Sequence, residues 1–317
     1  MQPLPFILDS WQFDTNGART LPHTDIGNQS NVWLHCDRNH EGLSEWLANQ
    51  GITSEVLTAL LAEDTRPRFE CLDDNSFLLI IRGVNLNEGK QPDDMLTIRM
   101  LYQNGRLISI RKHSSKAVSE VRNLLIEGRG PKTLPALVVA ILERVHEKID
   151  DLLEPTEQAI EDLDSEDGST ANQQKNQLNA LQKRLLKLNR FLKPQSYALE
   201  AFANAELDDF VPLQLPLAHQ KDVIMRIGES IDFYLAQLHL ISEKCQQQND
   251  TRMNRNTYML SVVAGIFLPL GFLTGLFGIN IGGMPGTENA EAFYWFCAAM
   301  SVIGVVEYLL FRRLKFV

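Results

Sequence analysis

Two apolar runs of membrane length in the C-terminal part of the chain constrain its fold more than any other feature. The first run is Met259–Phe277, and no charged residue occurs from Asn256 through Thr287. The second run is Ala292–Phe311, in which Glu307 is the only charged residue. A helix needs about 20 mainly apolar residues to cross the core of a bilayer. The pattern therefore predicts a C-terminal two-helix transmembrane hairpin, preceded by a large domain in water.

The composition limits the kinds of partner that this chain can take. It has 317 residues, of which 44% are hydrophobic and 22% charged, and a length that suggests about two domains. The net charge of -10 argues against nucleic acid as a partner, because binding to phosphates needs clustered Lys and Arg. No C-x-x-C motif occurs, so we expect a reducing compartment and no disulfide framework. The cysteines are Cys36, Cys71, Cys245 and Cys297.

Basic residues near the apolar runs predict the orientation of the hairpin. The connecting segment, Ile279–Glu291, contains no Lys or Arg. Positive charge concentrates on the cytoplasmic side of membrane helices. We therefore expect both termini in the cytoplasm and the connecting loop outside, and we do not expect the start MQPLPFILDS to be a signal peptide. The flanking basic residues are Arg252, Arg255, Arg312, Arg313 and Lys315.

The first 130 residues read as a mixed α+β domain. Runs rich in Val, Ile, Leu and Phe alternate with turn residues, and Asn104-Gly105 between two such runs is a strong hairpin signal. Helical spacing occurs at Gly42–Asn49, Ser54–Glu63 and Ser115–Glu127. The order in which the strands pair cannot be read from these patterns. The expected strands are Pro5–Gln12, Asn31–Cys36, Arg68–Leu72, Ser76–Val84, Met95–Tyr102 and Arg106–Lys112.

A helical hairpin with oppositely charged arms is expected next, over about Leu134–Leu207. Eleven Asp or Glu residues lie between Glu143 and Asp167, whereas six Lys or Arg residues lie between Lys175 and Lys193. The simpler interpretation is two antiparallel helices whose charges face each other, each exposed pair contributing little. The functional interpretation is an acidic surface that gathers cations.

A long helix is predicted to begin near Leu217 and to continue into the first apolar run. Seven residues step by 3 and 4, which is a heptad seam, and no proline interrupts the chain from Leu217 to Leu268. The seam is open to two interpretations, packing on the preceding hairpin or parallel association with copies of the same chain. Its residues are Ile224, Ile227, Ile231, Tyr234, Leu238, Ile241 and Cys245.

The sequence contains no motif for hydrolysis or for a structural metal site. The segment Gly83–Gln91 is too long for a P-loop and lacks the following Ser or Thr. We find no nucleophile with a base, so an enzyme is not expected. His35, Cys36 and His40 are weak candidates for metal ligands, because their spacing is not that of a zinc site and a second ligand cluster is missing. Chance neighbours at a strand edge are the more probable interpretation.

A stripe of small and polar residues runs along the first predicted membrane helix. Small residues allow close helix packing, which is the simpler interpretation. They also leave room for a narrow pore with constrictions at Leu260 and Leu268. Two helices cannot enclose such a pore, so transport would require an oligomer. The pore-lining candidates are Asn256, Thr257, Leu260, Ala264, Leu268, Gly271 and Gly275.

The segment after this helix could meet a hydrated ion. Divalent cations hold water tightly, and a neutral ring of carbonyl and amide oxygens can bind a hydrated ion without stripping it. Gly278, Ile279 and Asn280 could supply that ring, and Glu288 and Glu291 would add negative potential at the outer mouth.

Glu307 is the one acidic residue within the second apolar run. An acid at membrane depth is costly and often functional. Because this one lies near the cytoplasmic end, snorkelling or pairing with a neighbouring arginine is the simpler interpretation. A carboxylate that titrates protons is the alternative.

These motifs resemble those of the CorA superfamily of divalent metal transporters. The matching segments are Tyr258–Leu260, Phe267–Leu270, Gly275–Asn280 and Met284-Pro285, followed by a second span that ends in basic residues. The family signature is Gly-Met-Asn where this chain has Gly278-Ile279-Asn280, and the isoleucine looks like the ZntB branch, whose members are described as zinc transporters. The resemblance implies a funnel-shaped homopentamer whose long helix lines a central pore. It also implies zinc entry coupled to a proton gradient, with Gly278, Ile279 and Asn280 as the outer selectivity loop.

The first hypothesis is therefore a Zn²⁺ transporter of the bacterial inner membrane, a multi-pass homopentamer in the lipid bilayer with no fixed cofactor. A magnesium or broad divalent cation channel is the second hypothesis, and a membrane-anchored scaffold or sensor is the third. The sequence does not indicate the direction of transport. The expected parts are 1–130 (cytoplasmic α+β domain), 131–216 (helical hairpin), 217–258 (stalk helix), 259–278 (first transmembrane helix), 279–291 (periplasmic loop), 292–311 (second transmembrane helix) and 312–317 (basic tail).

Overall fold

The computed structural model describes residues 4–15, 17–23, 26, 29–165, 171–278 and 289–313. Contacts divide the chain into an N-terminal unit, Met1–Ile241, and a C-terminal unit, Ser242–Val317. Several predictions fall outside the described residues: the helical-hairpin turn at 167–169, the loop residues Ile279, Asn280 and Glu288, and the tail from residue 314.

The N-terminal unit contains a seven-stranded sheet with strand order β2-β1-β3-β7-β6-β5-β4. Neighbouring strands are antiparallel except for β3 and β7, which are parallel. The six predicted strands are confirmed within two residues at each end. The seventh, β2, was not predicted, because its sequence GART has no apolar alternation. The strands are β1 (Ile7–Asp14), β2 (Gly17–Thr20), β3 (Val32–Asp37), β4 (Arg68–Asp73), β5 (Ser76–Gly83), β6 (Leu96–Gln103) and β7 (Arg106–Arg111).

The predicted hairpin turn at Asn104-Gly105 is confirmed between β6 and β7. Both residues have positive φ, 53° and 65°, and Gln103 pairs with Arg106 across the turn. A two-residue turn with positive φ at both positions matches the twist of the strands, and Asn-Gly adopts it at little cost. This turn sets the register that places Arg99 opposite Ile110.

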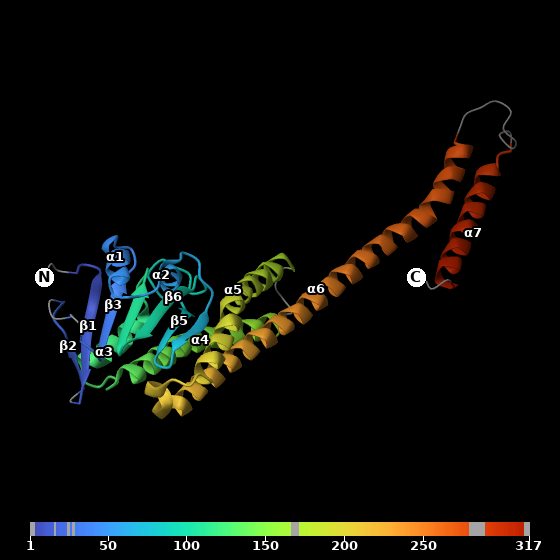
Figure 1. Cartoon of the computed structure of the whole chain (residues 1–317). Coiled ribbons are helices and arrows are strands. Elements are labelled where there is room, and N and C mark those ends of the chain that lie inside the picture. Colours follow the sequence, from blue (N-terminus) through green and yellow to red (C-terminus); the bar gives the residue numbers. More distant parts are fainter. Residues whose placement is uncertain are drawn as a thin grey trace. The chain divides into compact units, whose positions relative to one another are not determined.

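Helices cover both faces of the sheet (Figure 1). Buried side chains of α1 (Gly42–Ala48) and α2 (Ser54–Leu61) pack with alternate residues of β3, β5 and β7 in one hydrophobic cluster. On the other face, α3 (Lys116–Ile126) lies beside His35, and α4 (Leu134–Ser165) contributes Val145, which lies next to Gly83. Residues of β5 are buried along its whole length, as expected for a strand covered on both faces.

The predicted helical hairpin is present as α4 and α5 (Ala171–Ala203), followed by a 3-10 helix, η2 (Asp208–Leu213), and α6 (Gln214–Phe277). The basic residues of α5 do not all pair with acidic residues of α4. Lys187 instead pairs with Asp93 and Asp94 of the β5–β6 loop, at 3.0 and 2.9 Å. The simple picture of two arms neutralising each other is therefore incomplete.

The heptad seam of α6 is buried within the chain itself. Ile224, Ile231 and Leu238 have no exposed surface. Polar contacts tie the same helix to the hairpin, because Asn189 donates to Asp232 at 2.7 Å and His146 donates through Nδ1 to Gln220 Oε1 at 2.8 Å. The packing interpretation of the seam is therefore confirmed.

Acid is expected to destabilise the N-terminal unit through His146. Burial lowers its pKa from 6.5 to about 4, and its Nε2 has no hydrogen-bond partner among the described residues. As the pH falls, the unfolded chain therefore binds a proton on this histidine near pH 6.5, whereas the folded unit binds it only near pH 4. The contribution of His146 to the free energy of unfolding is fully present above pH 6.5, and up to about 3 kcal/mol is lost as the pH drops toward 4.

Urea unfolding at pH 7 and pH 5 measures this slope. His35, whose pKa burial lowers to about 3, contributes in the same direction, so His146→Gln should remove only part of it. The exposed His113→Gln variant serves as the control and should keep the full slope. An identical slope in His146→Gln and the unchanged protein would contradict the assignment.

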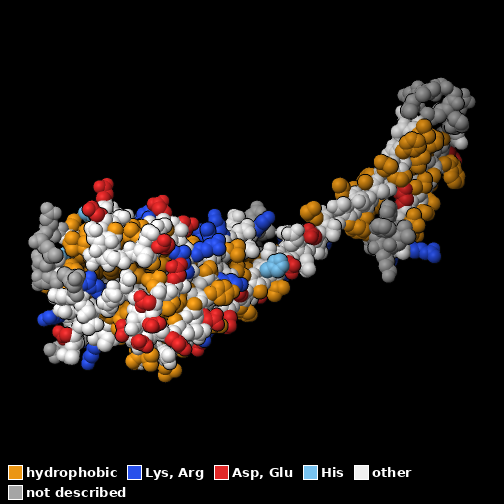
Figure 2. All heavy atoms as spheres, in the orientation of Figure 1, with side chains coloured by type: hydrophobic (Ala, Val, Ile, Leu, Met, Phe, Trp, Pro, Cys, Tyr) orange, Lys and Arg blue, Asp and Glu red, His pale blue; other side chains and the backbone are white. Residues whose placement is uncertain are grey.

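The C-terminal unit holds the last part of α6 and α7 (Ala292–Arg313). Both helices are long and apolar enough to cross a membrane by length and composition, and their apolar windows are not buried inside the chain. Figure 2 shows the hydrophobic side chains of this unit at its surface. Both predicted spans are therefore present as continuous helices, and α6 continues through Pro269 to Phe277.

Candidate functional site

One face of the last part of α6 is covered by α7. Half-buried residues recur at steps of three or four on both helices, as expected for two helices in contact. The rings of Phe277 and Phe296 lie 5.2 Å apart between centroids. The half-buried residues of α6 include Tyr258, Val262, Ile266, Pro269, Leu270 and Leu273, and those of α7 are Ala292, Phe296, Met300, Ile303, Gly304 and Glu307.

The predicted pore-lining residues lie on the opposite face of α6. At about 100° per residue, the stripe from Thr257 to Gly275 is centred about 160° from the face that contacts α7. Every predicted position is exposed, and Asn256 lies at the edge of the stripe. The sequence predicted the stripe but not this relationship. In a single chain the small residues are therefore free to face another copy or an axis.

The stripe is open and uncharged. A Cβ atom built at Gly271 or Gly275 would meet nothing within 4 Å. The hydroxyls of Ser261 and Thr274 bond to carbonyl oxygens of their own helix, Ser261 to Thr257 and Thr274 to Leu270 and Gly271. Among the described residues, no group of three His, Cys, Asp or Glu side chains could hold a metal ion. The described stripe therefore offers no charged side chain that could ligate a metal ion.

Gly278 ends the helix in a position that only glycine suits. Its backbone N–H donates to the carbonyl of Thr274 at 2.9 Å, and a Cβ atom there would lie 2.9 Å from the same oxygen. Such a contact is too close for any other residue without movement of the backbone. Ile279 and Asn280, which follow directly, lie outside the described residues.

The start of α7 is also defined by local hydrogen bonds. The Asn289 side chain accepts from the backbone N–H of Glu291 at 3.0 Å, and its carbonyl accepts from the N–H of Ala292 at 3.1 Å. An asparagine in this position satisfies N–H groups that a helix start leaves free. Glu291 is exposed directly before the first residue of α7, where its charge is favourable to the helix dipole.

Glu307 belongs to the contact between α6 and α7. It is half-buried on the α7 face that meets α6, and its Oε2 is buried without a hydrogen-bond partner among the described residues. Glu307 also makes no salt bridge with any described residue, so the expected pairing with a neighbouring arginine is not observed.

The weak metal candidates do not converge. His35 and Cys36 are neighbours on β3, so their side chains point to opposite faces of the sheet. Ser109 Oγ lies 2.8 Å from His35 Nδ1, and burial raises the pKa of the Cys36 thiol. His40 Nδ1 accepts from the N–H of Gly42 at 3.3 Å. These contacts make His35 and Cys36 structural residues of the sheet.

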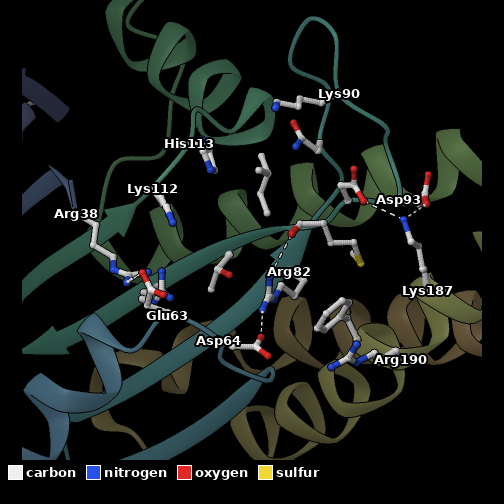
Figure 3. A pocket seen from close by; sticks show the side chains of 17 residues that line it. Arg38, Glu63, Asp64, Arg82, Lys90, Asp93, Lys112, His113, Lys187 and Arg190 are labelled. Atoms are coloured by element: carbon white, nitrogen blue, oxygen red, sulfur yellow. Dashed lines mark hydrogen bonds and ion pairs between the residues drawn. The ribbon is translucent and has the colours of Figure 1, made fainter.

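The sequence analysis missed a polar cavity of about 460 Å³ in the N-terminal unit (Figure 3). Arg82 on β5 and Arg99 on β6 line it, together with Arg38 after β3. The signal was present, since each of these two strands carries an arginine among apolar residues that are otherwise buried.

Known proteins resemble this chain in sequence and in fold. The family profile described as "CorA-like Mg2+ transporter protein" matches residues 28–313. "Zinc transport protein ZntB" of Vibrio parahaemolyticus is 43% identical over 313 residues, which cover 98% of this chain and 97% of the relative. "Divalent cation transporter CmaX" of Pseudomonas aeruginosa is 32% identical over 94% of this chain and 91% of its own length. The solved "structure of the full-length CmaX protein" superposes with a TM-score of 0.82 at 28% identity, covering 98% of each chain.

Proposed function

The chain belongs to the family of CorA-like Mg2+ transporter proteins, and from this membership we propose that it carries divalent cations, zinc foremost, across the bacterial inner membrane. It is thus a transporter rather than an enzyme. The preference for zinc rests on the 43% identity to a zinc transport protein over nearly the whole of both chains. The observation that carries the pathway is the open, uncharged stripe on the face of α6 opposite α7.

The pathway in this proposal forms between copies of the chain. Two helices cannot enclose a polar channel, whereas five copies of α6 with their stripes turned inward can do so. In this homopentamer α7 stands outside α6, Leu260 and Leu268 narrow the pore, and Gly271 and Gly275 leave it wide. Hydrophobic constrictions of this kind gate a pore by excluding water.

Selection is assigned to the outer end of the same helix. The carbonyls of Gly278 and Ile279 and the side chain of Asn280 form a neutral ring around a hydrated ion, and Glu288 and Glu291 attract cations to it. Zinc normally favours His and Cys ligands, and the described part of the stripe offers none. Discrimination between zinc and magnesium therefore does not come from direct ligation along α6.

Proton coupling is the finer part of the proposal, and Glu307 is its candidate carrier. Its unpartnered Oε2 lies in the α6–α7 contact, so a change in its charge acts directly on the pore-lining helix. Both termini lie in the cytoplasm in this arrangement, and the gradients of the ion and the proton set the direction of transport.

Zinc entry into liposomes tests the proposal. The purified protein is reconstituted in vesicles that hold a zinc-sensitive dye, and initial rates are measured with and without an inward proton gradient. Asn280→Ala is expected to lower the rate at least tenfold, because one hydrogen bond to a charged species contributes about 1.5–3 kcal/mol. Asn123→Ala, an exposed asparagine on α3, is the matched control and should transport normally.

The outcomes separate the three functions. Entry that is faster with the proton gradient and lost in Asn280→Ala supports proton-linked zinc transport through the loop. Entry that ignores pH and admits magnesium equally well favours a broad divalent channel. If no ion enters and the chain is monomeric, the hairpin is only an anchor and the proposal fails.

A further inference from the structure

The cavity in the N-terminal unit lies on the sheet face that also carries α1 and α2. Arg82 pairs with Thr97 and Arg99 with Ile80 across β5 and β6, so both arginines point to the same face. Arg38 follows directly after β3, and the in-out alternation of that strand places its side chain on the same face. The cavity extends from these guanidinium groups to the β5–β6 loop and to α5, whose Phe191 ring lies 4.4 Å from the Arg82 guanidinium carbon.

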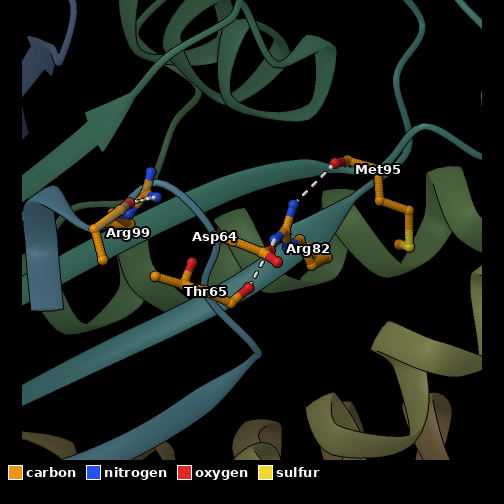
Figure 4. Close-up of polar contacts among 6 residues, drawn as sticks. Asp64, Thr65, Arg82, Met95 and Arg99 are labelled. Atoms are coloured by element: carbon orange, nitrogen blue, oxygen red, sulfur yellow. Dashed lines mark hydrogen bonds and ion pairs between the residues drawn. The ribbon is translucent and has the colours of Figure 1, made fainter.

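Arg99 is a buried charge without adequate partners. Arg99 is 1% exposed, and among the described residues its side chain makes one hydrogen bond, from Nη2 to the carbonyl of Ala62 at 2.8 Å (Figure 4). Its Nε and Nη1 have no partner within the part of the chain that the structure describes. Burial, with Arg38 and Arg82 nearby, lowers the pKa of Arg99 to about 10. A buried cation beside two like charges is costly unless an anion accompanies it.

The acidic residues around the cavity do not supply that anion. Asp64 lies 3.4 Å from Arg82 and Glu63 lies 3.8 Å from Arg38, but these carboxylates are 81% and 87% exposed. Exposed ion pairs of this kind contribute little. Arg82 also donates to the carbonyls of Met95 at 3.2 Å and Thr65 at 2.6 Å, and its Nε has no partner among the described residues. Asp93 and Asp94 are engaged by Lys187.

Further cations surround the mouth of the cavity. Figure 3 shows Lys90, Lys112 and His113 across the hollow from Arg82 and Asp64. In total seven Lys or Arg line the cavity against four Asp or Glu, although the whole chain carries a net charge of -10. The excess of positive charge is therefore local, and it gathers where the Arg99 donors are unsatisfied.

We propose that this cavity binds a small molecule that carries a phosphate group, with the phosphate against Arg99 and the lysines at the mouth. A phosphate offers several acceptor oxygens and close to two negative charges, which suit a set of guanidinium and ammonium donors. The volume exceeds that of a phosphate alone and falls within the usual range for small organic ligands. The cavity shares no residue with the pathway along α6, so the proposed ligand binding does not depend on the proposed ion transport.

Equilibrium dialysis of the full-length protein in detergent tests the site. Radiolabelled inorganic phosphate and AMP are the two probes, in buffer with low salt and a chelator that removes divalent metals. One saturable site per chain is expected. Arg99→Met should raise the Kd about tenfold to a hundredfold, because it removes a charged hydrogen-bond donor. Lys112→Ala, at the exposed mouth, should raise the Kd and leave the fold intact, whereas exposed Lys132→Ala should change neither.

Circular dichroism separates binding from folding, and Arg99→Met should keep the melting temperature of the unliganded protein because it removes an unpaired buried charge. Tighter binding of AMP than of phosphate assigns the rest of the cavity to the organic part of the ligand, and equal binding assigns the site to free phosphate; both support the proposal. Saturation by neither probe at millimolar concentration overturns it. Equal affinity in Lys112→Ala, Arg99→Met and the unchanged protein overturns it as well.

Discussion

Replacing Gly275 with leucine is expected to abolish ion transport and to leave the N-terminal unit unaffected. Gly275 lies on the open stripe of α6, and a Cβ atom built at this position meets no atom within 4 Å. The backbone of the monomer therefore leaves space for a side chain to begin here. In the proposed pentamer the same substitution places five isobutyl groups at one level of the pore, where they exclude water and the hydrated ion. The initial rate of zinc entry in liposomes measures the loss, which should be at least a hundredfold.

A matched substitution on α7 provides the control. Ala298 is exposed and lies on the side of α7 away from α6, so Ala298→Leu adds the same bulk toward lipid rather than toward the pore. Its transport rate should remain within twofold of the unchanged protein. The oligomeric state of both variants is measured in parallel. If Gly275→Leu dissociates the oligomer, the stripe is a packing surface between helices, and the assignment of these residues to a pore is wrong.

The position of the stripe gives this experiment its meaning. The face of α6 toward α7 carries mainly large side chains, such as Ile266 and Leu270, although Gly265 lies there as well. The opposite face carries Ala264, Gly271 and Gly275 together with the two leucines Leu260 and Leu268. A helix that only anchors a domain needs one apolar surface toward lipid and has no reason to segregate glycine and alanine on one side. Segregation away from the partner helix favours a second, intermolecular contact or an axial channel.

Most elements of this fold could be predicted from the sequence because they are encoded locally. The strands of the N-terminal unit other than β2 alternate or are mainly apolar, Asn104-Gly105 specifies its own turn, and the stalk repeats its apolar residues every three or four positions. The order of the strands could not be predicted, because it depends on contacts between distant segments. The parallel pairing of β3 with β7, for example, places Trp33 where its Nε1 donates to Ser109 Oγ at 2.8 Å.

The two candidate sites differ in the same way. The stripe on α6 lies within one helix, so its spacing revealed it, although only the structure shows that it faces away from α7. The cavity of Arg38, Arg82 and Arg99 is assembled from the segment after β3, the neighbouring strands β5 and β6, and α5, which is distant from them in sequence. Each arginine alone looks like an ordinary strand residue. A charged residue inside an otherwise apolar strand is the local sequence signal that indicates such a cavity.

The largest effect on stability is expected from Phe202→Ala in the N-terminal unit. Phe202 is 1% exposed and joins α5 to the sheet and to η2, with ring centroids 4.8 Å from Phe77, 5.0 Å from Phe69 and 5.4 Å from Phe210. Removing a buried phenyl ring costs about 3–5 kcal/mol, because apolar burial is lost and a cavity remains. Urea unfolding followed by the fluorescence of buried Trp33 measures the change as a lower midpoint.

Tyr197→Ala on the same helix separates this packing effect from the loss of an aromatic residue as such. Tyr197 is 60% exposed, so its removal should change the free energy of unfolding by no more than about 0.5 kcal/mol. Helix α5 also carries Lys187, which contacts the β5–β6 loop, and Gln195, which accepts a hydrogen bond from the backbone N–H of Arg82. Loosening the C-terminal end of α5 should therefore also disturb the arginine cavity. A loss below about 1 kcal/mol in Phe202→Ala would show that the neighbouring rings collapse into the space, and that α5 is held to the sheet mainly by these polar contacts.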